Sequence, residues 1–142
     1  MKVLLLNLLL AVGVSGSAQS KIIAQIANAR NDRGVCRVCL FNNAAAFTGD
    51  SGAPVQCVQA SVKSGKAEAV FENITAGEYA VAVFHDANNN NKMDKNFLGI
   101  PKEGYGASRN KLPFASAPSF DDNKFTVPAK TTTTLRIRLR NL

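Results

Sequence analysis

Residues 77–86 read GEYAVAVFHD, and within this segment Tyr79, Val81 and Val83 alternate with Ala80, Ala82 and Phe84. In an extended chain, Tyr79, Val81 and Val83 point to one side and the residues between them point to the other. This alternation predicts a β-strand over 79–85 with one face against a core. The Gly-x-Tyr sequence is also typical of a tyrosine corner, in which the phenol hydroxyl bonds to a nearby backbone group in a Greek-key sandwich. An ordinary half-buried strand tyrosine is the alternative.

Similar segments lie on both sides of this strand and predict further strands at 21–29, 35–41, 55–63, 66–72, 124–127 and 131–139. Turn residues separate them, and we expect hairpins around Ser64-Gly65 and around Pro128-Ala129-Lys130. No segment shows a convincing helical period. About seven short strands in 142 residues indicate an all-β fold, a single antiparallel Greek-key β-sandwich with one long ordered loop at about 86–120.

The first eighteen residues have the pattern of a secretory signal peptide. Lys2 precedes an apolar run over 3–14, and small residues at 15–18 lead to Gln19. A run of about a dozen apolar residues is too short to span a bilayer. We therefore predict a signal peptide at 1–18, a β-sandwich domain at 19–142, no membrane span after cleavage, and a periplasmic or extracellular location.

The three cysteines favour one disulfide and one free thiol in an exported protein. Cys36 and Cys39 have C-x-x-C spacing, but they lie within a predicted strand rather than at the start of a helix, which argues against a redox motif. On that strand Cys36 faces the core and Cys39 faces outward, and Cys57 is also predicted to face outward. A Cys39–Cys57 bridge therefore fits better than Cys36–Cys57, and both pairings stay open.

Composition excludes several kinds of site. The chain has one His, three Cys and no Trp, which excludes zinc sites with several His or four Cys and type 1 copper centres. Lys and Arg number 17 against 10 Asp and Glu. Arg136, Arg138 and Arg140 form a predicted cationic stripe that can bind an anionic envelope component or protect an edge strand. Nucleic acid is not an expected partner, because basic and aromatic residues do not interleave.

The long loop begins with oxygen-bearing side chains at nearly every second position. Asp86, Asn88, Asn90 and Asp94 fall at positions 1, 3, 5 and 9 of a calcium loop, and the Lys92 carbonyl falls at position 7. Phe97 occupies the place of the usual bidentate Glu, which Glu103 could replace by folding back. We predict a weak calcium site formed by Asp86, Asn88, Asn90, Lys92, Asp94 and Glu103. The alternative is an Asn-rich turn whose side chains bond to their own backbone.

The segment from Gly77 to Ser108 also resembles a known family. Its core, GEYAVAVFHDANNNNKMD at 77–94 and FLGIPKEGYG at 97–106, is similar to the signature of the bacterial domain-of-unknown-function 2141 family. This resemblance implies an exported β-sandwich related in shape to transthyretin-like and collagen-adhesin B-type modules. Members of that wider group often carry a D-x-N-x-[DN]-G calcium loop, which 86–94 resembles with Asn91 in place of Gly. The resemblance implies no particular activity.

Two functions of different classes follow from these residues. The first is a non-enzymatic exported module with a structural or binding role at the cell envelope, its long loop organised by calcium. The second is a small extracytoplasmic hydrolase-like enzyme that uses His85 with Asp86 or Glu103, and Ser108 as a nucleophile. Strand parity places His85 and Asp86 on opposite faces, so no complete catalytic constellation is found. We therefore predict that the protein is not an enzyme and assign no catalytic residue.

Overall fold

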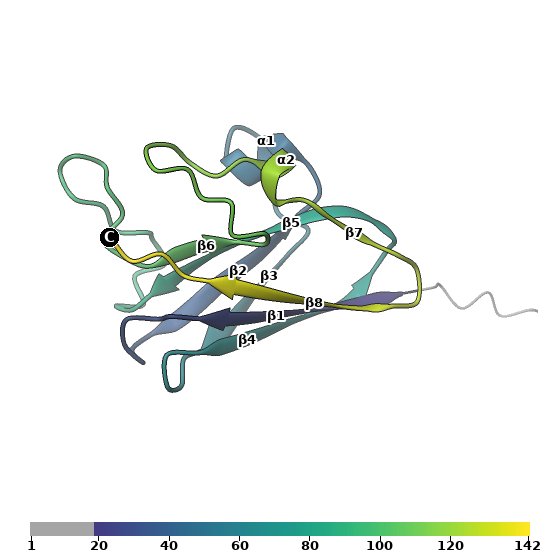
Figure 1. Cartoon of the computed structure of the whole chain (residues 1–142), viewed down its shortest axis with the longest axis horizontal. Coiled ribbons are helices and arrows are strands. Elements are labelled where there is room, and N and C mark those ends of the chain that lie inside the picture. The colour runs from purple at the N-terminus through teal and green to yellow at the C-terminus, as the bar shows by residue number, and fades with distance from the viewer. Residues whose placement is uncertain (1–18) are drawn as a thin grey trace, which may run out of the picture.

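A computed structural model describes residues 19–142, and the predicted signal peptide at 1–18 lies outside the described residues. The elements are β1 (Ser20–Ala27), β2 (Val35–Phe41), α1 (Ala44–Thr48), β3 (Gln56–Ser61), β4 (Ala67–Ile74), β5 (Gly77–Asp86), β6 (Tyr105–Ala107), α2 (Phe120–Asn123), β7 (Phe125–Val127) and β8 (Thr132–Arg138). The strands form two layers, as Figure 1 shows, which confirms the predicted all-β sandwich.

One sheet has three strands in the order β4-β1-β8, and the other runs β3-β2-β5-β6 with β7 beside β5. The chain crosses from one sheet to the other four times, between β1 and β2, β3 and β4, β4 and β5, and β7 and β8. The β1–β2 and β4–β5 crossings are interlocked. β1 pairs with β4 in one sheet, and β2 pairs with β5 in the other. Two crossing connections interlocked in this way are typical of Greek-key sandwiches.

Two details of the predicted pairing are wrong. β1 and β8 pair in parallel, from Lys21 opposite Thr132 to Ala27 opposite Arg138, whereas the other strand pairs are antiparallel. The hairpin expected around 128–130 does not form, because β7 pairs with β5 and β8 with β1. Both strands bury one face in the same core, so alternation along the sequence cannot tell which sheet each one joins.

The hairpin expected around Ser64-Gly65 exists only at its tip. Lys63 and Lys66 form a bridge, and beyond it β3 and β4 separate into different sheets. The Asp32 carboxylate accepts hydrogen bonds from the Ser64 and Gly65 amides, both at 2.8 Å, and holds this turn.

The core lies between the inner faces of the two sheets. Ile22 and Ile26 of β1, Val38 and Leu40 of β2, and Phe71 of β4 are nearly or fully buried there. None of the described residues from 84 to 124 belongs to this hydrophobic cluster. The long segment after β5 therefore lies outside the core and adds no apolar side chain to it.

Tyr79 forms the predicted tyrosine corner. Its ring is buried, and its hydroxyl donates a hydrogen bond of 2.7 Å to the Thr75 carbonyl four residues earlier. The Thr75 hydroxyl lies 3.1 Å from the same phenol oxygen. The bond fixes the turn between β4 and β5 and so sets where β5 begins.

Cys39 and Cys57 lie opposite each other on β2 and β3 and form a disulfide, with a Cα–Cα distance of 4.1 Å. The preferred pairing is confirmed. Cys36 faces the core as a free thiol, and burial raises its pKa to about 11. The disulfide thus lies on the outer face of the five-stranded sheet.

The segment predicted as one loop at 86–120 contains β6, whose three residues pair with β5 and divide it. We call residues 87–104 the first loop and residues 108–119 the second loop. Two short helices, α1 and α2, were not predicted; they lie together, with the Phe47 and Phe120 rings 6.1 Å apart. Elements of three to five residues are too short to show a period of 2.0 or 3.6.

Candidate functional site

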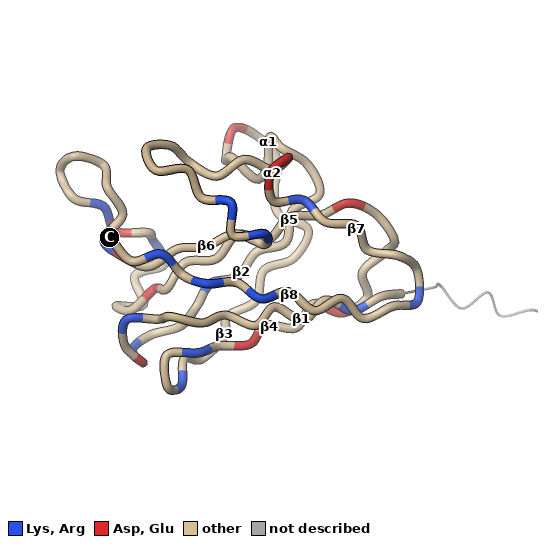
Figure 2. The backbone as a smooth tube through the Cα atoms, in the orientation of Figure 1, with Lys and Arg blue, Asp and Glu red and all other residues tan. Residues whose placement is uncertain are grey.

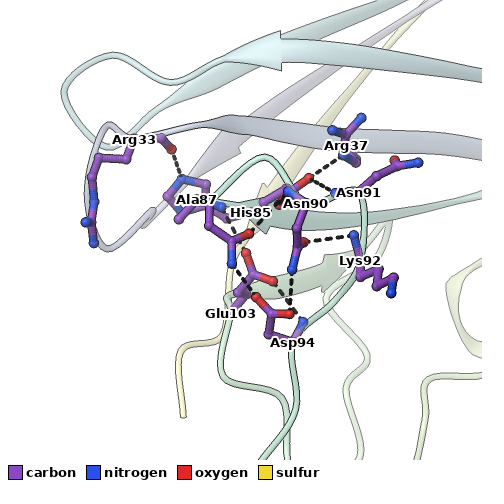
Figure 3. A network of polar contacts seen from close by, with 11 residues as sticks. Arg33, Arg37, His85, Ala87, Asn90, Asn91, Lys92, Asp94 and Glu103 are labelled. Atoms are coloured by element: carbon purple, nitrogen blue, oxygen red, sulfur yellow. Dashed lines mark hydrogen bonds and ion pairs between the residues drawn. The ribbon is translucent and has the colours of Figure 1, made fainter.

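Asp86, at the end of β5, anchors the first loop. Its side chain is fully buried and accepts a hydrogen bond from Arg37 Nε at 2.6 Å, drawn in Figure 3. The Asn90 and Asn91 amides donate to the same carboxylate at 3.1 and 2.9 Å. Burial alone would raise the pKa of Asp86, but the Arg37 guanidinium and the two amides outweigh it and hold the pKa below its ordinary value.

The asparagine-rich part of the first loop closes on Asp94. The side-chain NH₂ groups of Asn88 and Asn90 each donate to one Asp94 carboxylate oxygen at 2.7 Å, which lowers the pKa of Asp94. The Lys92 amide donates to Asn90 Oδ1 at 3.0 Å. Asn91 adopts a left-handed backbone with φ 63°, a conformation that Asn tolerates better than most residues other than Gly.

Glu103 folds back onto the first loop. Its carboxylate accepts hydrogen bonds from the Ala87 and Asp94 amides, both at 2.9 Å, and so joins the two ends of the loop (Figure 3). Phe97, in the place of the usual calcium-binding Glu, is 95% exposed. Glu103 is therefore near the loop, but each of its oxygens already has a backbone donor.

These residues fit calcium only in part. Their oxygens are of the hard type that calcium prefers. However, Arg37 already neutralises Asp86, and Asp94 is faced by the NH₂ groups of Asn88 and Asn90 rather than by their oxygens. Within residues 19–142 there is no group of three or more His, Cys, Asp or Glu placed to hold a metal ion. The six predicted residues thus lie in one hydrogen-bonded loop, and the binding of calcium to this loop stays a prediction.

In residues 19–142, no hydrogen bond joins the side chains of the hydrolase hypothesis to one another. The His85 Nε2 atom lies 2.6 Å from the Arg33 carbonyl, and no hydrogen bond joins His85 to Asp86 or Glu103 in the described chain. Ser108 is buried; its hydroxyl donates to the Asn123 carbonyl at 2.6 Å and accepts from the Val81 amide at 3.0 Å. Both side chains bond to backbone groups of neighbouring segments.

A groove of about 610 Å³ lies over the outer face of the five-stranded sheet, between the two loops. The small side chains of Cys39 and Ala82 face it from β2 and β5, and Phe41 and Phe84 flank them. The loops contribute Leu98, Ile100 and Phe114. Its charged lining residues are Arg37 and Lys95, with no Asp or Glu among the residues that line it. Arg37 is paired with Asp86, so the groove combines apolar walls with one cation, Lys95, that is unpaired within residues 19–142.

Residues 24–135 match the family described as "Uncharacterized protein conserved in bacteria (DUF2141)". The chain belongs to this family. The match includes the Asp86 network, the groove floor and both loops, and it confirms the resemblance seen in the sequence. No curated protein and no solved structure matches the chain.

Asn123 anchors the second loop of this DUF2141 member and was not predicted from the sequence. This side chain is fully buried; its Oδ1 accepts from the Arg109 and Lys111 amides at 3.2 Å, and its Nδ2 donates to the Lys111 and Ser119 carbonyls at 3.0 Å. Arg140 donates to the Leu112 and Pro113 carbonyls at 2.8 and 3.0 Å. Arg140 is therefore a structural member of the predicted stripe.

The groove was also missed, although the sequence holds a signal for it. The first loop carries Phe97, Leu98 and Ile100, and the second carries Phe114, in segments where polar residues are usual.

No helix among residues 19–142 of this DUF2141 member has the length and apolar character needed to cross a membrane.

Proposed function

We propose that this protein is an exported, non-enzymatic β-sandwich module that binds a ligand at the cell envelope through the groove between its two loops. The observation that carries the proposal is the groove itself, which has apolar walls, a lysine, Lys95, that is unpaired in the described chain, and a volume of about 610 Å³. Sites of this size with a few placed polar groups are typical of ligand binding.

The construction of the loops supports a binding role. A buried polar side chain holds the base of each loop, Asp86 for the first and Asn123 for the second. The loop residues that line the groove are therefore held in place before any ligand arrives. A preorganised site loses less conformational entropy when it binds.

Export is supported by the signal-like pattern at 1–18 and by the Cys39–Cys57 disulfide, because disulfides persist in oxidising compartments. The non-enzymatic part is supported by the engagement of His85, Ser108 and Glu103 with backbone groups. An anionic partner suits Lys95 in the groove, since Arg37 is already paired with Asp86.

The groove can be tested with the anionic, apolar dye anilinonaphthalene sulfonate and the chain 19–142. We expect the dye to bind with enhanced fluorescence, and Ile100→Ser to raise its dissociation constant about fivefold through loss of apolar contact. Val55→Ser is the matched control, since Val55 is 46% exposed, Ile100 is 41% exposed, and Val55 does not line the groove. Absence of dye binding, or an equal loss in both variants, contradicts the proposal.

We further propose that calcium strengthens the first loop through the oxygens of Asp94, Asn88 and Asn90. In thermal melts, about 10 mM calcium should raise Tm by several degrees over EDTA if the site is of the weak extracellular kind. Magnesium should have less effect, and Asp94→Asn should abolish the calcium response. Identical melts in calcium and EDTA would show that hydrogen bonds alone order the loop.

A further inference from the structure

The tips of the two loops carry the most exposed large apolar side chains of the described chain. Phe97 is 95% exposed and Phe114 is 98% exposed, and Leu98 beside Phe97 is 68% exposed. An exposed phenylalanine ring in water is unfavourable, and apolar residues that gather on one surface mark a site of interaction.

The two tips lie on the same side of the molecule. Leu98 and Ile100 from the first loop and Phe114 from the second line one groove, so the tips face each other across it. Figure 1 shows both loops projecting from the sandwich toward the end where the C-terminus lies, opposite to the β7–β8 turn.

Positive charge lies along both loops below their tips. The first loop carries Lys92, Lys95 and Lys102, and the second carries Arg109 and Lys111 at its base. None of these five forms an ion pair within the part of the chain that the structure describes. Figure 2 shows uncharged tips with Lys and Arg nearer the bases of the loops.

The two acidic residues of the first loop, Asp94 and Glu103, offset part of this charge and leave a net charge of +3 over the two loops. Both oxygens of Glu103 accept backbone amides, and both oxygens of Asp94 accept the side-chain amides of Asn88 and Asn90. Asp94 and Glu103 are half-buried, whereas the three lysines are exposed.

We propose that the two loop tips dock on a lipid bilayer that contains anionic phospholipid. The rings of Phe97 and Phe114 enter the boundary between headgroups and acyl chains, and the five cations contact the phosphates. Interfacial binding of this kind grows with buried apolar area and with attraction to anionic lipid. This inference rests on the proposed binding function and names its partner at the envelope.

The absence of Trp from the chain provides a direct test. Phe97→Trp and Phe114→Trp each introduce a single fluorophore at a tip, and Ala129→Trp places one at the exposed β7–β8 turn as control. The probes are vesicles of phosphatidylglycerol and phosphatidylcholine in equal parts, and vesicles of phosphatidylcholine alone. On the anionic vesicles, we expect the Trp emission of the two tip variants to shift to the blue and to be quenched by brominated acyl chains. The emission of Ala129→Trp should show neither effect.

Vesicle sedimentation separates the two contributions. Phe97→Ser with Phe114→Ser should lower the partition coefficient about tenfold for each ring removed. Lys95→Gln with Lys102→Gln should lower it about fivefold for each lysine and reduce the salt dependence of binding. Val55→Ser, a comparable loss of an exposed apolar side chain elsewhere, should leave binding unchanged. Circular dichroism and Tm confirm that each variant is folded.

The proposal is overturned if the chain does not bind anionic vesicles, or if Ala129→Trp responds like the tip probes. A blue shift without vesicles that grows with protein concentration would instead show that the tips contact a second copy. Dye binding in the groove with no vesicle binding would leave the proposed function intact and exclude the lipid surface. Loss of both would overturn both.

Discussion

At the scale of single residues, Asp86 controls the first loop. It is a fully buried carboxylate whose charge is balanced by Arg37 and by two backbone amides. Breaking a buried, hydrogen-bonded ion pair leaves one partner uncompensated and is strongly destabilising. Arg37, the partner of this carboxylate, lines the groove, so the effect of Asp86 on stability and its effect on binding are linked.

We predict that Asp86→Asn lowers the free energy of unfolding by about 3 kcal/mol, because Arg37 loses its charged partner. Urea unfolding of residues 19–142 at pH 7 measures this. Asp121→Asn is the control, since Asp121 is 81% exposed and lies 3.5 Å from Lys124; a surface pair of this kind contributes less than about 1 kcal/mol. Equal losses in the two variants would contradict the assigned role of Asp86.

The pH dependence of the same variant follows from the lowered pKa of Asp86. An unfolded Asp has a pKa of about 3.9, so the stabilisation is complete above that pH and is lost as the pH falls through the lower folded value. As the pH falls below about 4, the free energy of unfolding should therefore decrease less for Asp86→Asn than for the parent chain. Some acid dependence will persist, because the pKa values of Asp32 and Asp94 are also lowered.

At the scale of elements, the tyrosine corner fixes the start of β5. The Tyr79 hydroxyl bonds to the Thr75 carbonyl and ties the end of β4 to the first part of β5. β5 then pairs with β2, β6 and β7 and carries Asp86 at its end. The position of the first loop thus depends on this turn.

We predict that Tyr79→Phe lowers the free energy of unfolding by about 1 kcal/mol through loss of the buried hydrogen bond. Tyr105→Phe is the control, because Tyr105 is half-buried and its hydroxyl has no hydrogen bond within residues 19–142. Thermal melts of the two variants provide the comparison. A Tyr79→Phe variant as stable as Tyr105→Phe would show that the corner is not needed.

At the scale of the whole molecule, the two loops contribute no side chain to the hydrophobic cluster inside the sandwich. The hydrophobic cluster takes its residues from the strands and none from 84–124 among the described residues. The carboxylate of Glu103 lies 2.9 Å from the Ala87 amide, so the ends of the first loop are already close together. A short linker can span them.

We predict that replacing residues 88–102 by a short Gly-Ser linker leaves a folded sandwich with a cooperative melt and an intact disulfide, but without dye or vesicle binding. Replacing β8, residues 132–138, by a linker of the same length should prevent folding, since Leu135 and Ile137 are buried in the core. Far-UV circular dichroism distinguishes these results. An unfolded chain without the first loop would show that the loop is part of the folding unit.

The sequence by itself determined the features that depend on residues close together in the chain. Alternation gave the long strands, the outward direction of Cys39 and Cys57 and the inward direction of Cys36, because the side-chain period of a strand is local. The tyrosine corner spans four residues, and the turns of the asparagine-rich segment span two to five. The meeting of Asp86 with its own loop was therefore predictable.

Only the tertiary structure decided which distant segments meet. Arg37 is 49 residues from Asp86, and Arg140 is 27 residues from Pro113. The parallel pairing of β1 with β8 joins the two ends of the domain. The groove needs three strands, β2, β5 and β6, and two loops at once. Each contact depends on how the sheets stack and on which strands become neighbours, and side-chain periodicity is the same for every choice of neighbour.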